Sequence, residues 1–133
     1  MLYVDSSVLL KRDVEEPDSD HAEGFLLADE LWVTARHTRI EVRRNLARLL
    51  DGRALEQARE IFEDDWQRMH VIALDDVTCD LAADLAEATG ARTLDALHLA
   101  GASRVGSSGL TFVTFDVRQA QAARSLGMVV VGT

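Results

Sequence analysis

The sequence has one cysteine, one proline, one lysine and no long apolar run, and these scarcities exclude several classes of protein. The single cysteine, Cys79, rules out an internal disulfide and a metal site built on several thiolates. Because Cys79 lies between apolar stretches, we predict a packing residue rather than a nucleophile. No apolar run approaches the ~20 residues that cross a bilayer. The start, MLYVDSS, lacks the basic and apolar regions of a signal peptide, so we expect a cytoplasmic protein.

The 133 residues are predicted to form one domain, spanning 1–133. The hydrophobic fraction of 47% and the charged fraction of 28% are those of a globular chain with a core, which excludes disorder. Aromatic residues make up 5%, too few for an evident platform on which nucleobases stack.

The formal net charge is -9, which argues against passive binding to nucleic acid through Lys and Arg. It does not exclude an enzyme that recruits metal ions, because metal-binding carboxylates themselves add negative charge. The acidity also fits a basic protein partner, or simply a solvated surface.

Short apolar runs alternate with segments of helical character. Five β-prone runs are predicted to be strands, at 2–4, 31–34, 70–74, 111–114 and 128–131. Helices are predicted over 18–29, 37–50, 54–68, 76–89, 94–105 and 117–126. This alternation predicts an α/β fold, a three-layer sandwich around a central, parallel, five-stranded sheet.

Several acids stand just past predicted strands, where open α/β sheets bind their ligands. They are Asp5, Asp75, Asp76 and Asp116, and Asp95 opens a helix rich in small residues that favours close packing on the sheet. Each has a simpler interpretation as a helix cap or first-turn acid, except Asp5. Asp5 precedes Ser6 and Ser7 and starts no predicted turn, so it is the strongest candidate for a site.

Gathered carboxylates repel one another, and divalent cations remove that repulsion. Mg²⁺ prefers oxygen ligands, and Mn²⁺ also fits such a set. Two ions ~3.5–4 Å apart can activate a water and stabilise the leaving oxygen of a phosphodiester. The sequence contains no nucleophile elbow, P-loop or G-x-G-x-x-G motif that would favour another chemistry.

An arginine-rich helix offers the clearest basic surface. Arg39 and Arg43 stand four residues apart, as do Arg44 and Arg48, so these side chains could contact RNA phosphates. A solvated helix face with local ion pairs, including one between Glu41 and Arg44, explains the same pattern. His98, three residues after Asp95, could donate to a carboxylate.

Four segments together resemble the PIN-domain ribonucleases, and more narrowly the VapC-type toxins of toxin–antitoxin pairs. They are VDSS at 4–7, RIEVRR at 39–44, TLDALHLA at 93–100 and VTFD at 113–116. The resemblance implies a parallel sheet with its first strand near the centre and a Mg²⁺- or Mn²⁺-dependent endoribonuclease. It also implies an RNA substrate, a VapB-type antitoxin and a homodimer.

Carried over by position, the resemblance makes Asp5, Glu41, Asp95 and Asp116 the catalytic acids. Asp5, Asp95 and Asp116 hold the metal, Glu41 completes the set, and a metal-activated water attacks the scissile phosphate. Ser7 and Thr114 match supporting hydroxyl positions. Many members have a further acid just after the last one, whereas this chain has Arg118 and Gln119.

Two other functions remain open from the sequence. A receiver-like signalling domain would use Asp75 as phosphoacceptor and Thr114 as switch residue, but it needs a lysine after the fifth strand. The chain ends VVVGT, and its only lysine is Lys11. A catalytically inactive PIN-like interaction module is the third possibility.

Overall fold

The computed structural model describes residues 1–106 and 108–133. Five parallel strands form one sheet in the order β3-β2-β1-β4-β5, so the first strand is central. The strands are β1 (Leu2–Val4), β2 (Trp32–Ala35), β3 (His70–Ile72), β4 (Thr111–Val113) and β5 (Val129–Val131). The predicted parallel, five-stranded α/β fold is confirmed.

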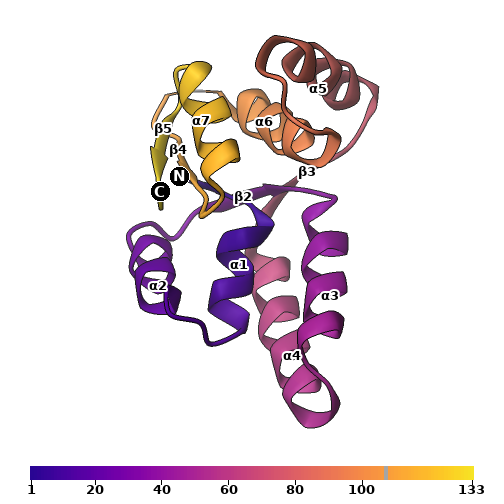
Figure 1. Ribbon diagram of the computed structural model, residues 1–133, viewed down its shortest axis with the longest axis vertical. Helices are drawn as coiled ribbons and strands as arrows, with labels where there is room; N and C mark the ends of the chain where they lie inside the picture. The colour runs from indigo at the N-terminus through magenta and orange to yellow at the C-terminus, as the bar shows by residue number, and fades with distance from the viewer. Residues whose placement is uncertain (107) are drawn as a thin grey trace.

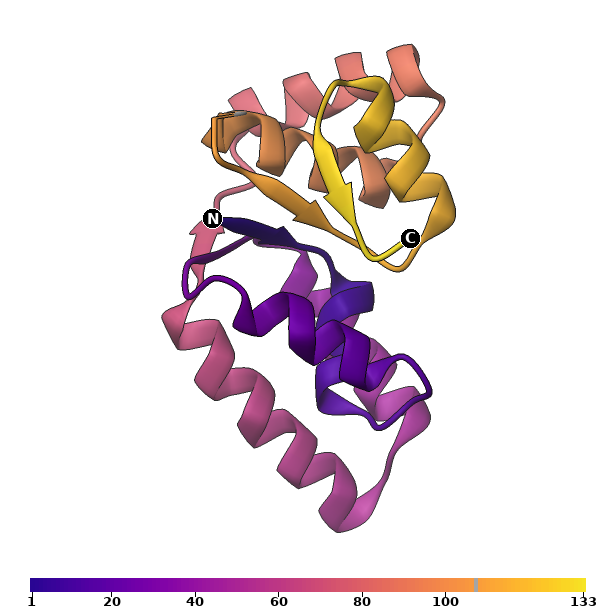
Figure 2. The same cartoon turned by 90° about the vertical axis from the view of Figure 1, so that its left-hand side faces the viewer.

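Helices cover both faces of the sheet, which gives three layers (Figures 1 and 2). One face carries α1 (Ser6–Asp13), α2 (Ser19–Leu27), α3 (Thr38–Leu49) and α4 (Gly52–Arg68). The other face carries α5 (Asp76–Thr89), α6 (Thr93–Val105) and α7 (Val117–Ser125).

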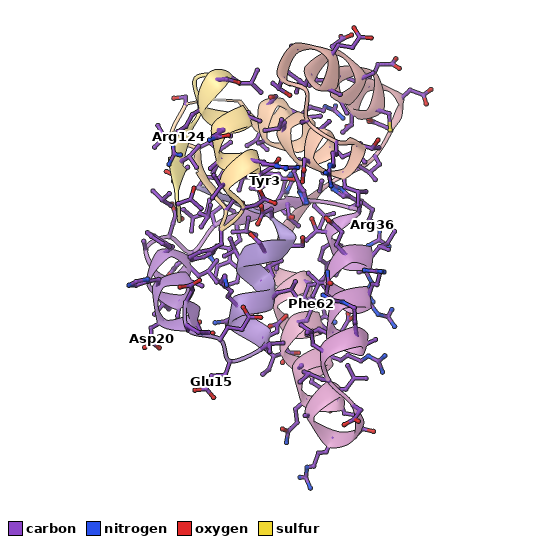
Figure 3. The ribbon with its side chains drawn as sticks, in the orientation of Figure 1. Tyr3, Glu15, Asp20, Arg36, Phe62 and Arg124 are labelled. Carbon is purple, nitrogen blue, oxygen red and sulfur yellow. The ribbon has the colours of Figure 1, made fainter. Side chains whose placement is uncertain are left out.

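Alternate residues of β1 enter the two halves of the core, because successive side chains of a strand point to opposite faces. Leu2 and Val4 pack in the half that contains Phe62, whereas Tyr3 packs in the half that contains Leu99. Figure 3 shows Tyr3 and Phe62 on these two sides. All of β1 is buried, so the residue that follows it emerges at a fixed place on the sheet edge.

Helix α6 lies close to the sheet because Gly101 and Ala102 face it, whereas Ala96 and Ala100 pack on α5. Ala96, Ala100, Gly101 and Ala102 are all buried. A Cβ atom at Gly101 would lie 3.0 Å from the hydroxyl of Tyr3, so this position has no room for a side chain. The close approach fixes the start of α6, and with it Asp95, near the strand ends.

The structure corrects three predictions. Helix α1 was not predicted, and Asp5 does begin a turn, since its carboxylate accepts from the backbone amides of Ser7 and Val8 and caps the helix. The eight-residue helix is too short to display a clear apolar period. Cys79 is exposed rather than packed, because α5 buries Thr78 and Ala82 instead. Strand ends differ from the predicted ones by one or two residues.

None of the helices in the described ranges is long and apolar enough to span a bilayer.

Candidate active site

The candidate site lies where the strand order reverses. β1 has β2 on one side and β4 on the other, so the connections on either side of β1 run in opposite directions. Such a switch point leaves a crevice beyond the carboxyl ends of the strands. Asp5 directly follows β1, and Thr114 and Asp116 follow β4. The topology therefore brings the two ends of the chain to one crevice.

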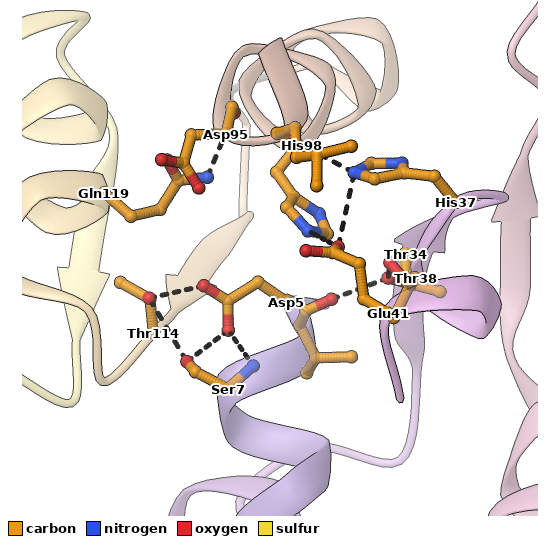
Figure 4. A network of polar contacts seen from close by, with 12 residues as sticks. Asp5, Ser7, Thr34, His37, Thr38, Glu41, Asp95, His98, Thr114 and Gln119 are labelled. Carbon is orange, nitrogen blue, oxygen red and sulfur yellow. Dashed lines mark hydrogen bonds and ion pairs between the residues drawn. The ribbon is translucent and has the colours of Figure 1, made fainter. Parts of the chain in front are cut away.

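Asp5 is almost completely buried, with 4% of its surface exposed. One carboxylate oxygen accepts from the Ser7 hydroxyl at 2.6 Å, and the other accepts from the Thr114 hydroxyl at 2.5 Å. Burial raises the pKa of Asp5, while the positive charge of His98 and these hydrogen bonds oppose the rise. The network holds the carboxylate in a single orientation (Figure 4).

Ser7 and Thr114 also tie β4 to α1. The Ser7 hydroxyl accepts from the amide of Phe115 at 3.0 Å, and the Thr114 hydroxyl accepts from the amide of Asp116 at 3.1 Å. Gly132 packs so closely on the Thr114 carbonyl that a Cβ there would clash, and its φ of 108° also favours glycine. The Thr114 hydroxyl thus contacts both Asp5 and the backbone of Asp116.

Glu41 reaches the crevice from α3 and binds two histidines. His98 Nε2 lies 2.7 Å from its carboxylate, and His37 Nε2 lies 3.5 Å away. Burial alone would raise the pKa of Glu41, but the hydrogen bond and charge of His98 lower it below the usual range. The predicted Glu41–Arg44 pair is wrong, because Glu41 turns toward α6 instead.

The two imidazoles have different surroundings. His98 Nδ1 lies 2.9 Å from the Tyr3 hydroxyl, whereas His37 Nδ1 is buried without a partner. Burial lowers the pKa of His37 to about 4. Ligand atoms of His37, Glu41 and His98 lie within 4.8 Å of one another, close enough to share an ion.

Asp95 and Asp116 complete the crevice from α6 and α7. Burial raises the pKa of Asp95, and the negative charge of Asp116 raises it further, with smaller contributions from Glu41 and Asp5. Asp116 caps α7 through the amides of Arg118 and Gln119. Asp95 therefore lies close enough to the other three acids to feel their charge. We call Asp5, Glu41, Asp95 and Asp116 the acidic cluster; Figure 4 shows Asp5 turned toward Ser7 and Thr114, and Glu41 turned toward His98.

Two acids that the sequence offered lie elsewhere. Asp75 follows the edge strand β3, which β2 separates from β1. Its carboxylate caps α5 and pairs with Arg104 at 2.9 Å. Asp76 is an exposed first-turn residue of the same helix. Both have the structural roles that the sequence allowed.

The arginines of α3 border a separate groove of about 500 Å³, which we call the arginine groove. Its lining consists of Arg36, Arg39, Ile40, Arg43, Arg44 and Arg59. Arg39 pairs with Glu63 of α4, and Arg48 lies outside the groove and bonds to Asn45. Glu41 contacts α6 while Arg39 contacts α4, so the two side chains leave α3 in different directions.

Two basic residues that were not predicted from the sequence to belong to the site lie beside Asp95 and Asp116. Arg92 and Arg118 line a groove of about 610 Å³ together with Asp95 and Asp116. The available signal was proximity in the chain, since Arg92 stands three residues before Asp95 and Arg118 two residues after Asp116.

Known proteins share both the sequence and the fold. The PIN domain family matches residues 2–125. Ribonuclease VapC46 of Mycobacterium tuberculosis is 36% identical over 130 residues, which cover 98% of this chain and 95% of that protein. Ribonuclease VapC47 of the same species is 31% identical over 97% of this chain and 94% of its own length. The chain therefore belongs to the PIN domain family, among its VapC-type ribonucleases.

Solved structures agree on the fold. The FitAcB structure from Neisseria gonorrhoeae superposes with a TM-score of 0.76 at 21% identity, covering 98% of this chain and 96% of that chain. Mycobacterium tuberculosis VapC20, described as a sarcin–ricin-loop-cleaving toxin, gives a TM-score of 0.71 at 18% identity, covering 100% and 98%. The receiver-like alternative is wrong, because that fold has the strand order 2-1-3-4-5.

Proposed function

We propose that this chain is a metal-dependent endoribonuclease, the toxin of a toxin–antitoxin pair, which cleaves RNA phosphodiester bonds at the acidic cluster. The observation that carries the proposal is the convergence of four carboxylates, from four segments of the chain, on the crevice beside β1. The electrostatic coupling of Asp95 to the other three acids supports it.

The donor set fits Mg²⁺ or Mn²⁺. Asp5, Asp95 and Asp116 would hold the ion and Glu41 would complete the set, since hard divalent cations prefer carboxylate oxygens. Burial raises the pKa values of Asp5 and Asp95, and repulsion by Asp116 raises that of Asp95 further; a bound cation would favour the ionised forms of both. When bound, such an ion supplies positive charge and lowers the pKa of water at the site.

The chain's own residues orient the reacting groups. Ser7 and Thr114 hold the carboxylate of Asp5, and His98 holds that of Glu41. Fixed placement of charged groups is the main contribution that a protein makes to phosphoryl chemistry. The crevice thus presents the carboxylates of Asp5 and Glu41 in orientations that hydrogen bonds hold.

RNA contact is further proposed at Arg39, Arg43, Arg44 and Arg48. The first three of these arginines line the arginine groove, together with Arg36 and Arg59. Arg48 has less support, because it lies outside the groove.

We also propose that residues 1–133 act as one domain and work in the cytoplasm, where RNA substrates are found. A homodimer and a basic, VapB-type antitoxin are the proposed protein partners. The net charge of -9 favours a basic partner, and the antitoxin could place an arginine in the acidic cluster.

The deciding experiment measures cleavage of a labelled RNA by purified protein in Mg²⁺, Mn²⁺ or EDTA. We expect cleavage with either ion and none in EDTA. Asp5→Asn is expected to abolish cleavage. Asp75→Asn serves as the matched control and should cleave like the wild type, because Asp75 is paired with Arg104 outside the cluster.

Cleavage that persists in EDTA, or full activity of Asp5→Asn, would reject the mechanism. Absence of cleavage under every condition, with RNA and antitoxin still bound, would instead favour the inactive interaction module.

A further inference from the structure

The groove beside Asp95 and Asp116, here called the α6–α7 groove, joins the acidic cluster to a surface of different character. Its volume of about 610 Å³ lies in the range typical of ligand sites. Small and apolar residues, among them Ala91, Val117 and Ala122, form part of its lining. Val117 is 60% exposed and so adds accessible apolar surface to the groove.

Two arginines face this groove without ionic partners. Arg92 and Arg118 are exposed, and neither forms an ion pair within 1–106 or 108–133. Both belong to helix N-termini, since Arg92 precedes the first turn of α6 and Arg118 lies in the first turn of α7. Positive helix ends and guanidinium groups both favour a phosphate.

A buried side chain in the wall supplies an independent observation. Gln119 is 1% exposed, and its amide nitrogen donates to the backbone carbonyl of Asp95 at 3.1 Å. Its Oε1 atom is buried and has no hydrogen-bond partner. A buried, unpaired acceptor costs about 1–3 kcal/mol, which a donor from a ligand would recover.

We propose that the α6–α7 groove is the subsite for the nucleotide next to the scissile bond of a single-stranded RNA. Arg92 and Arg118 bind its phosphate, and Ala91, Val117 and Ala122 contact its base. Gln119 Oε1 accepts from a ribose hydroxyl or a base amino group. This inference rests on the proposed function, because the acidic cluster must be the place of cleavage for the groove to hold a flanking nucleotide.

The location of the groove favours this subsite over the arginine groove. Asp95 and Asp116 belong to both the acidic cluster and the α6–α7 groove, so an RNA strand passes from one to the other without crossing a helix. The arginine groove lies beyond α3 from Glu41.

The test measures binding of a fluorescent single-stranded RNA to the uncleaving Asp5→Asn protein at fixed Mg²⁺ concentration. Arg118→Gln or Arg92→Gln in that background is expected to weaken binding about tenfold, the effect of losing one charged hydrogen bond. The slope of log K against log salt should fall by about 0.7 for each lost phosphate contact. Arg118→Lys should restore part of the affinity.

Arg53→Gln is the matched control. Arg53 is exposed at the start of α4, which Figure 1 shows at the opposite end of the molecule from α7. Arg53→Gln removes one positive charge and should change the affinity for the RNA less than twofold. Equal effects of Arg53→Gln and Arg118→Gln would overturn the subsite, and so would a large loss confined to Arg43→Gln. Since binding is measured without cleavage, an RNA that binds but is never cleaved by the wild type rejects the proposed function alone.

Discussion

His98 Nε2 lies 2.7 Å from the Glu41 carboxylate, and its other ring nitrogen lies 2.9 Å from the hydroxyl of Tyr3. A carboxylate can only accept, so His98 Nε2 donates to Glu41, while the other ring nitrogen shares a hydrogen bond with the Tyr3 hydroxyl. Tyr3 and His98 are both buried, at 0% and 2% exposure. A residue of the central strand thus orients the histidine that in turn orients the acid on α3.

Tyr3→Phe is expected to lower the rate of RNA cleavage about tenfold while leaving the fold intact. The change removes the hydroxyl that anchors the His98 ring, and a misplaced group at a catalytic site typically costs that much or more. Single-turnover cleavage kinetics and Mn²⁺ affinity are the measurements. Exchange of an exposed histidine, His21→Gln, is the control and should alter neither quantity.

His98→Gln should lose more activity than Tyr3→Phe, because it removes the hydrogen bond to Glu41 itself. Unchanged Mn²⁺ affinity and cleavage in both variants would show that the chain of three residues only packs.

Thr114→Val is expected to destabilise the protein by about 1–3 kcal/mol, since it leaves a buried oxygen of Asp5 without its donor. Urea unfolding measures the loss. Thr114→Ser keeps the hydroxyl and should recover most of the stability. A valine variant as stable as the wild type would contradict the assigned hydrogen bond.

Asp95→Asn is expected to stabilise the metal-free protein and to abolish its thermal stabilisation by Mn²⁺. Burial and the charges of Asp116, Glu41 and Asp5 raise the pKa of Asp95, so its ionised form is unfavourable in the folded state. Thermal unfolding with and without Mn²⁺ measures both effects. A variant that still gains the wild-type stabilisation from Mn²⁺ would remove Asp95 from the metal ligands.

The buried carboxyl of Asp13 makes the free energy of unfolding depend on pH, and this effect is separate from the acidic cluster. Its two carboxylate oxygens are buried and unpaired, and burial, followed by the charge of Asp65, raises its pKa to about 8. Between its unfolded pKa of about 4 and this value, the folded state holds a proton that the unfolded state releases. Stability from this group is therefore complete below about pH 4 and is lost as pH rises toward 8.

Asp13→Asn should remove that dependence. Its stability relative to the wild type is expected to increase from pH 5 to pH 8, by at most about 1.4 kcal/mol per pH unit, and then to level off. Urea unfolding at several pH values measures the difference. A difference that stays constant over this range would show that Asp13 ionises normally.

The local character of most segments was readable from the sequence. Helical and strand periods depend on neighbouring residues, so the alternation of strands with helices, and hence the parallel α/β class, followed from the chain itself. The motifs around Asp5, Glu41, Asp95 and Asp116 selected these acids through a family pattern. Helix α1 was not predicted from the sequence, because eight residues display too little helical periodicity.

Tertiary structure decided what each acid touches. Val4 pairs with Val113 of the neighbouring strand, so the carboxyl ends of β1 and β4 meet although these residues are far apart in the chain. That pairing gives Asp5 the hydroxyl of Thr114, and the packing of α6 gives Glu41 its histidine. The tertiary structure also separates Asp75 from the crevice and places Arg92 and Arg118 in one groove. Such contacts depend on strand order and helix packing, which no local period encodes, so only the folded chain could reveal them.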